Sequence, residues 1–261
     1  MRPQTRGRAC KSWPHSDLGG QELDDAWRIG DGIMAEFASR GSQKWLQVAV
    51  NRKPELLLGA LRRSGAIARR TSVTWKSPLG EDSLQEYRDG AALEKADLTQ
   101  LRNPLASFWP PRGPMWDAIG TTSDGPIFIE AKAHIPEAAT PATKASPESR
   151  KLIEQSLTKA RRFYAPKARA DWSIHFYQYA NRLAYQYFLR EMNDINSTLV
   201  FLYFLNADDM LGPTSEEEWE GASRLIHAVL GVPEDLTSHG VFDAFLDARL
   251  LQDGVQEACD S

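Results

Sequence analysis

The chain has 261 residues, of which 42% are apolar and 25% are charged, and only two are cysteines. This composition excludes a disordered chain, a collagen-like repeat and a disulfide-bonded scaffold, and it suits one folded domain. No uninterrupted apolar stretch reaches about 18 residues, and no apolar segment follows the charged start, so neither a membrane partner nor a secretory signal is expected. Cys10 and Cys259 lie near opposite ends of the chain, which suits a reducing, cytoplasmic location.

The net charge of −4 is unevenly distributed. Residues 52–70 hold six Lys and Arg against Glu55, and residues 144–169 hold eight against two Glu. If the fold brings these two basic segments together, they would line a groove for a nucleic-acid backbone. The alternative is two ordinary solvated helix faces.

Apolar periodicity and turn residues predict a single α/β domain over residues 21–261, preceded by a flexible tail over residues 1–20. Helices are favoured where a polar cap or a Pro precedes an apolar stripe, and strands where β-branched and aromatic residues run together. Helices are predicted at 42–50, 54–61, 91–101, 146–164, 173–193 and 215–230, and strands at 71–75, 115–121, 126–135 and 198–205. Residues 108–114 are too rich in Pro to be helical, and residues 241–248 fit either a final strand or a final helix.

The predicted hairpin formed by the second and third strands carries three charged residues. Glu130 and Lys132 are two residues apart, so on a strand they share one face. Asp117 joins them on that face if the turn is centred on Ser123-Asp124 or on Asp124-Gly125. The intermediate register would place Asp117 opposite Ala131 and separate it from Glu130 and Lys132.

Two carboxylates and an ammonium group on apolar strands are costly to bury unless they are paired or bind a cation. Carboxylate oxygens suit Mg²⁺, with Mn²⁺ as a substitute, and such an ion also accepts phosphate oxygens from a substrate. Phosphodiester hydrolysis is therefore the chemistry that this pattern favours, with Lys132 contacting the attacking water and the developing charge. The alternative is a buried Asp–Lys–Glu cluster without chemistry.

Asp117 and the triplet Glu130-Ala131-Lys132, within a strand, hairpin, helix and strand order over about residues 43–206, resemble the PD-(D/E)XK nuclease superfamily. The segments Trp109–Ala118 and Tyr177–Arg182 look like those of uncharacterised bacterial members. The resemblance implies a restriction-endonuclease-like core with a mixed central β-sheet flanked by helices. It also implies a Mg²⁺-dependent hydrolase acting on DNA. The Pro that names the motif is replaced by Trp116.

Residue by residue, the resemblance implies metal binding by Asp117, Glu130 and the carbonyl of Ala131, with Lys132 as the catalytic lysine. Members commonly add an acidic residue from the helix before the first strand. Glu55 is the best match for that residue, and Glu36 is a rival. The alternative for Glu55 is a solvated helix residue.

Further candidates lie on the two helices after the hairpin. Gln178 and Arg182 recur on one stripe of the second helix, where Gln178 would orient the metal-bound water and Arg182 would contact a phosphate. The alternative is a buried polar network that ties this helix to the sheet. Lys144 and Ser146 lie at the start of the first helix, where backbone N–H groups favour an anion, although ordinary capping explains Ser146 equally well.

The function predicted from the sequence is a metal-dependent nuclease whose partner is nucleic acid, with DNA preferred. The alternative is a catalytically weak nuclease-like module that binds nucleic acid or another partner. The sequence leaves open DNA against RNA, endonuclease against exonuclease, and a homodimer against a monomer.

Overall fold

The structure is a computed structural model that describes residues 36–256. The predicted tail at 1–20, Cys10 and Cys259 lie outside the described residues. The α-helices are α1 (Gly41–Asn51), α2 (Pro54–Arg63), α3 (Asp89–Lys95), α4 (Arg102–Phe108), α5 (Pro147–Tyr164), α6 (Tyr177–Tyr187), α7 (Glu216–Leu230) and α8 (Gln252–Gln256). The strands are β1 (Thr74–Ser77), β2 (Ala118–Thr122), β3 (Gly125–Lys132), β4 (Thr198–Leu205) and β5 (Val241–Asp247).

The five strands form one mixed sheet in the order β1-β2-β3-β4-β5. The pairs β1–β2 and β2–β3 are antiparallel, whereas β4 is parallel to both β3 and β5. The predicted α/β fold with a mixed central sheet and flanking helices is therefore confirmed. Residues 241–248, which fitted either element, form strand β5.

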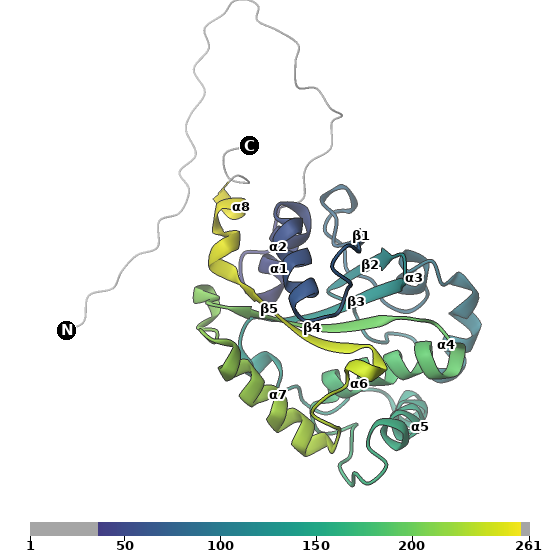
Figure 1. The fold of residues 1–261 in the computed structure, drawn as a ribbon. Coiled ribbons are helices and arrows are strands. Elements are labelled where there is room, and N and C mark those ends of the chain that lie inside the picture. The colour runs from purple at the N-terminus through teal and green to yellow at the C-terminus, as the bar shows by residue number, and fades with distance from the viewer. Residues whose placement is uncertain (1–35, 257–261) are drawn as a thin grey trace, which may run out of the picture. The chain divides into compact units, whose positions relative to one another are not determined.

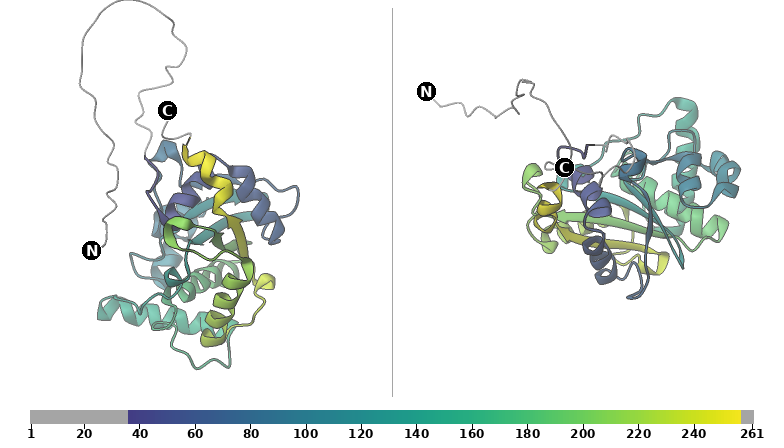
Figure 2. Two further views of the ribbon diagram at one scale, coloured as in Figure 1. Left: turned by 90° about the vertical axis from the view of Figure 1, so that its left-hand side faces the viewer. Right: turned by 90° about the horizontal axis from the view of Figure 1, so that it is seen from above.

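Helices cover both faces of the sheet, as Figure 1 shows with α1 and α2 on one side and α5, α6 and α7 on the other. Side chains alternate between these two cores along β3, because successive residues of a strand point to opposite faces. Ile127 and Ile129 belong to the core under α1 and α2, and Phe128 belongs to the core under α5 and α6. The left-hand view in Figure 2 shows the same separation. Glu130 follows Phe128 by two residues and therefore points toward α6.

The hairpin predicted from the sequence is present, and its register is one of the two that would gather the three charged residues on one face. Ala118 lies opposite Ile129 and Thr122 opposite Gly125, so the turn is centred on Ser123-Asp124. Gly125, the first residue of β3 after this turn, has φ of 140°, which glycine adopts far more readily than other residues.

Two predicted helices are shorter than expected because a residue in the left-handed region interrupts them. The helix predicted at 91–101 ends at Lys95, since Asp97 has φ of 59°, and the chain then restarts as α4. The helix predicted from residue 173 begins only at Tyr177, because Phe176 has φ of 46°. The first strand begins at Thr74 rather than at residue 71.

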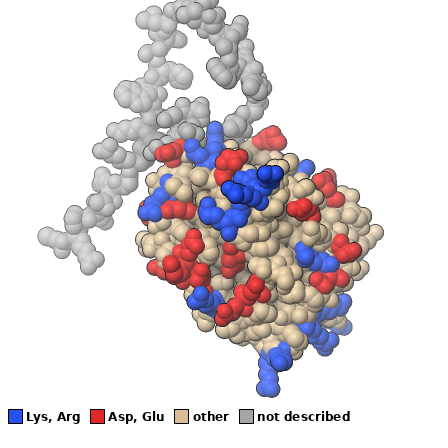
Figure 3. Space-filling view, viewed as in Figure 1, with Lys and Arg blue, Asp and Glu red and all other residues tan. Residues whose placement is uncertain are grey.

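The two basic segments do not form one groove. Segment 52–70 contains α2, which packs on one face of the sheet, whereas segment 144–169 contains α5, which packs on the other. Figure 3 accordingly shows Lys and Arg side chains in separate groups rather than in one continuous band. The condition for a shared phosphate groove is therefore not met, because the sheet lies between the two helices, and the alternative of two separate helix faces describes these segments. Within residues 36–256, no helix is long and apolar enough to cross a bilayer.

Candidate functional site

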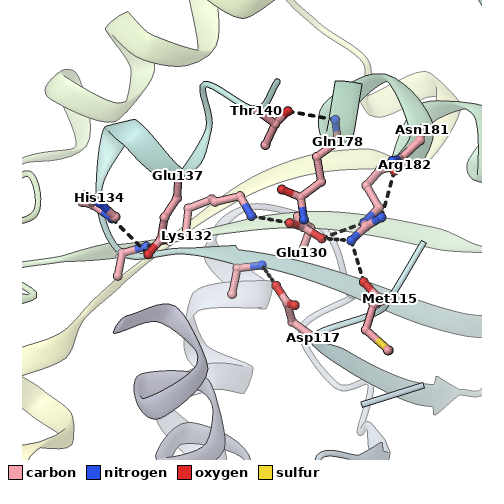
Figure 4. A network of polar contacts seen from close by, with 12 residues as sticks. Met115, Asp117, Glu130, Lys132, His134, Glu137, Thr140, Gln178, Asn181 and Arg182 are labelled. Atoms are coloured by element: carbon pink, nitrogen blue, oxygen red, sulfur yellow. Dashed lines mark hydrogen bonds and ion pairs between the residues drawn. The ribbon is translucent and has the colours of Figure 1, made fainter. Parts of the chain in front are cut away.

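The strongest cluster of buried charge lies near the end of β3, on the face covered by α6 (Figure 4). Glu130 is 1% exposed and Lys132 is 9% exposed. The Lys132 ammonium donates a hydrogen bond to Oε1 of Glu130. The prediction that these two residues share one face is confirmed, because alternation along the strand places them there.

Arg182 reaches the same carboxylate from α6. Its Nε donates to Oε2 of Glu130 at 2.6 Å, and its Nη2 lies 2.5 Å from that oxygen. The other donors of the guanidinium contact the carbonyl oxygen of Met115 at 2.5 Å and Oδ1 of Asn181 at 2.8 Å. Arg182 is 2% exposed, and its hydrogen bonds to protein groups do not support the expected phosphate contact. The alternative given above, a buried polar network that ties α6 to the sheet, describes this residue.

Asp117 occupies the bend that precedes β2, next to the edge of β3. Its Oδ2 accepts a hydrogen bond from the backbone N–H of Ala131 at 2.7 Å. The N–H and C=O of one residue point to the same edge of a strand, so the Ala131 carbonyl also points toward Asp117. Because β2 begins only at Ala118, opposite Ile129, this edge of β3 has no strand partner beyond that pair. The predicted ligands Asp117 and Ala131 are therefore adjacent.

Burial and charge give the two carboxyl groups opposite pKa shifts. Burial and the nearby charge of Glu130 raise the pKa of Asp117 to about 8. Burial alone would raise the pKa of Glu130 as well, but the positive charges of Arg182 and Lys132 hold it below its ordinary value. Burial lowers the pKa of Lys132, and the charges of Glu130 and Asp117 outweigh that effect and raise it. Burial thus favours the neutral form of Asp117, whereas two cationic partners favour the charged form of Glu130.

A third carboxylate, Glu86, approaches this cluster, and the sequence did not indicate it. The loop after β1 pairs with the chain just before Asp117, since the Trp116 N–H donates to the Tyr87 carbonyl at 2.9 Å. The charge of Glu86 raises the pKa of Asp117, and burial together with the charge of Glu130 raises that of Glu86 itself. The amide of Gln43 on α1 donates to Glu86 at 3.0 Å. Glu86 lies in an irregular loop, where no periodic pattern marks a functional residue.

The two residues proposed as an additional acidic metal ligand, Glu55 and Glu36, lie outside this cluster. Glu55 is exposed in the first turn of α2, which contacts β5 and α1 rather than the hairpin. Glu36 is exposed and precedes α1. Neither is among the charged groups that act on Asp117. The assignment of Glu55 as a metal ligand is therefore corrected, and Glu86 is the acidic residue that the fold brings to this position.

Gln178 lines the same small cavity as Glu130 and Lys132, whereas Lys144 and Ser146 lie just before the start of α5. Gln178 lies in the first turn of α6, where its backbone N–H donates to Oγ1 of Thr140 at 2.9 Å, and its side chain extends toward Glu130 in Figure 4. Ser146 caps α5 by accepting a hydrogen bond from the Ser149 N–H at 3.3 Å, which is the ordinary capping role. Lys144 is exposed on the loop before α5.

The donors at this site fit a divalent cation that keeps open positions. Among residues 36–256, no three Asp, Glu, His or Cys side chains lie close enough to enclose an ion by themselves. Mg²⁺ does not require such a cage, because it is commonly held by one or two carboxylates together with water and substrate phosphate. Asp117, Glu130 and the Ala131 carbonyl supply a donor set of that kind, and a bound cation would offset the burial and the Glu130 charge that raise the pKa of Asp117.

Comparison with known proteins finds no matching protein-family model, no matching curated protein and no matching solved structure.

Proposed function

We propose that this protein is a Mg²⁺-dependent nuclease that hydrolyses phosphodiester bonds of DNA through a PD-(D/E)XK-type site. The observation that carries the proposal is the convergence of Asp117 on the Glu130-Ala131-Lys132 segment at the open edge of β3. The order of strand β1, hairpin β2–β3, helix α5 and parallel strand β4 supports a restriction-endonuclease-like core.

Each group of the cluster has a role in this proposal. Asp117, Glu130 and the carbonyl of Ala131 hold the cation, and Glu86 adds negative charge beside them. Mg²⁺ bound there would polarise the phosphate and supply an activated water. The Lys132 ammonium stabilises the negative charge that develops on the phosphate, and its raised pKa keeps it protonated.

One observation favours the alternative, a nuclease-like module with little catalysis. Glu130 already has two cationic partners, Lys132 and Arg182, so its charge is balanced without a metal ion. A cluster that needs no metal for its electrostatics also suits a purely structural role. Metal uptake therefore separates the two functions.

The experiment compares cleavage of supercoiled plasmid, linear duplex and single-stranded DNA in Mg²⁺ or Mn²⁺ by wild-type protein and by Lys132→Met. The Met side chain keeps most of the buried stem and removes the ammonium group. We expect the rate to fall about 100-fold or more, the usual effect of removing one group that stabilises transition-state charge. Lys151→Met is the matched control, because Lys151 is exposed on α5.

Equal cleavage by wild type and Lys132→Met would identify a contaminant and reject the proposal. Calorimetric titration with Mn²⁺ is the second measurement. Absence of both cleavage and Mn²⁺ uptake in the wild type would favour the binding module, whereas uptake that Asp117→Asn weakens would support the metal site.

A further inference from the structure

A cavity of about 310 Å³ opens beside the charged cluster, between the loop that precedes β2, the loop that precedes α5 and the first turns of α6. Gln178 lines both this cavity and the small one that adjoins Glu130 and Lys132. A group bound in the larger cavity would therefore lie next to the cluster. We refer to it below as the side pocket.

The side pocket is positively charged in a protein of net charge −4. Arg112 and Lys144 line it together with Arg182, whose charge is paired with Glu130, and no Asp or Glu is among its lining residues. Another cavity of similar size, of about 300 Å³ beside α5, is different because Glu154 and Asp171 balance its two arginines. The side pocket thus favours an anionic ligand.

The wall of the side pocket is aromatic and the rim is fixed by hydrogen bonds. Trp109 and Tyr177 line it, and Tyr177 is partly exposed whereas Trp109 is buried. Asp89 accepts hydrogen bonds from the backbone N–H groups of Arg112 and Gly113, each at 2.8 Å, which holds the left-handed turn at Arg112 in place.

Hydrogen bonds also hold the rim of the side pocket that lies opposite the Arg112 turn. Thr140 accepts the hydrogen bond from Gln178 described above, and the Thr143 N–H donates to the Ser173 carbonyl at 3.0 Å. Arg150 also donates to the Thr143 carbonyl at 3.2 Å. Both rims are therefore ordered before a ligand arrives, which lowers the entropic cost of binding.

Building on the proposed nuclease function, we propose that the side pocket binds one unpaired nucleotide of the substrate strand, next to the phosphodiester bond that is cleaved. Arg112 and Lys144 bind its phosphate, and the base stacks on Tyr177. A base inside a duplex cannot enter a pocket of this size, so the substrate must be single-stranded, frayed or flipped at that position. The preferred substrate is therefore DNA with an unpaired nucleotide at the cleavage site.

The first test measures binding of deoxyadenosine monophosphate by calorimetry, without catalysis or metal. We expect Arg112→Ala and Lys144→Ala each to raise the Kd at least tenfold, because each removes a charge-assisted contact, and Tyr177→Leu to weaken binding as well. Lys151→Ala is the control and should bind as the wild type does. Deoxyadenosine and inorganic phosphate, which carry only half of the ligand, should both bind more weakly.

Equal affinity for the nucleotide in Arg112→Ala, Lys144→Ala and wild type overturns the proposal, and so does inorganic phosphate that binds as tightly as the nucleotide. The second test compares cleavage of single-stranded and duplex DNA. Tyr177→Leu should slow the single-stranded reaction more than the duplex reaction, and equal slowing counts against the side pocket.

The two proposals fail in distinguishable ways. Nucleotide binding that depends on Arg112, combined with no cleavage that depends on Lys132, rejects the nuclease and retains the side pocket. Cleavage that depends on Lys132, combined with no nucleotide binding, rejects the side pocket alone.

Discussion

The guanidinium of Arg182 on α6 contacts the carboxylate of Glu130 on β3 through Nε at 2.6 Å and Nη2 at 2.5 Å. Both side chains are almost fully buried, and 52 positions separate them in the chain. The pair therefore fixes helix α6 to the strand that carries the candidate catalytic residues. The Arg182 guanidinium also lies 4.7 Å from the Trp116 ring centroid, which adds a cation–π contact beside the bend at Asp117.

We predict that Arg182→Met lowers the free energy of unfolding by about 3–5 kcal/mol, because removal of one partner leaves Glu130 buried with less compensation. Urea denaturation followed by circular dichroism measures this change. Arg224→Met is the control, since Arg224 is 66% exposed and pairs with Glu220 along α7, where such pairs contribute about 0.3–0.5 kcal/mol. Equal effects of the two substitutions would contradict the structural role of Arg182.

Asp243 on β5 predicts a pH dependence of stability that is independent of the candidate site. Burial raises its pKa to about 6, although Ser223 donates to its carboxylate at 2.8 Å. A carboxyl group with a raised pKa is most favourable when protonated, so its contribution to stability falls as the pH rises from about 4 through about 6. Asp243→Asn removes this loss and should stabilise the protein more at pH 7.5 than at pH 4.5.

The stabilisation caused by Asp243→Asn should differ between the two pH values by no more than about 3 kcal/mol, since one pKa unit corresponds to about 1.4 kcal/mol. Urea midpoints of wild type and Asp243→Asn at both pH values measure it. Comparing the variant with wild type at each pH cancels the contributions of all other titrating groups. A constant difference across the range would show that Asp243 titrates normally.

Local pattern was sufficient to predict the parts of the site that lie on one strand. Glu130 and Lys132 share a face because they are two residues apart, and this holds whatever surrounds the strand. The pairing of Glu130 with Arg182 depends on how α6 packs on the sheet, and the position of Glu86 depends on a loop that crosses the chain at Trp116. Neither relationship leaves a periodic signal in the sequence.

Element boundaries were predicted less well where the backbone leaves the helical region at a residue other than Gly. Asp97 and Phe176 both adopt positive φ, which is uncommon for residues other than Gly, and each ends or delays a helix. The basic segments illustrate a different limit, because charge counts along the chain do not indicate which face of the sheet a helix covers. The cavity beside Arg112 likewise needs three segments that are far apart in the sequence.

Glu86 and Glu55 provide a matched pair for testing which acid supports metal binding. We predict that Glu86→Gln weakens Mn²⁺ uptake severalfold, because the Glu86 charge acts on Asp117, whereas Glu55→Gln leaves uptake unchanged. Both substitutions remove one negative charge from the protein, so a difference in Mn²⁺ uptake between them reflects the position of the charge rather than the net charge. Calorimetry or the paramagnetic effect of Mn²⁺ on water relaxation gives the affinity. Equal weakening would indicate a long-range charge effect rather than a local one.

The hairpin turn gives a last prediction, which concerns the strand that holds Glu130. Gly125 has φ of 140°, and a Cβ at this position would lie 2.0 Å from the carbonyl oxygen of Asn196, whose side chain donates to the Asp124 carbonyl at 2.8 Å. Gly125→Ala must therefore move either the turn or the segment before β4, and we expect it to lower the free energy of unfolding by at least about 2 kcal/mol. Gly221→Ala is the matched control, because a Cβ there meets nothing within 4 Å on α7 and should stabilise the helix by about 0.5–1 kcal/mol. Thermal and urea denaturation of both variants measure the two effects, and a stabilising Gly125→Ala would show that the turn does not approach Asn196 as closely as described.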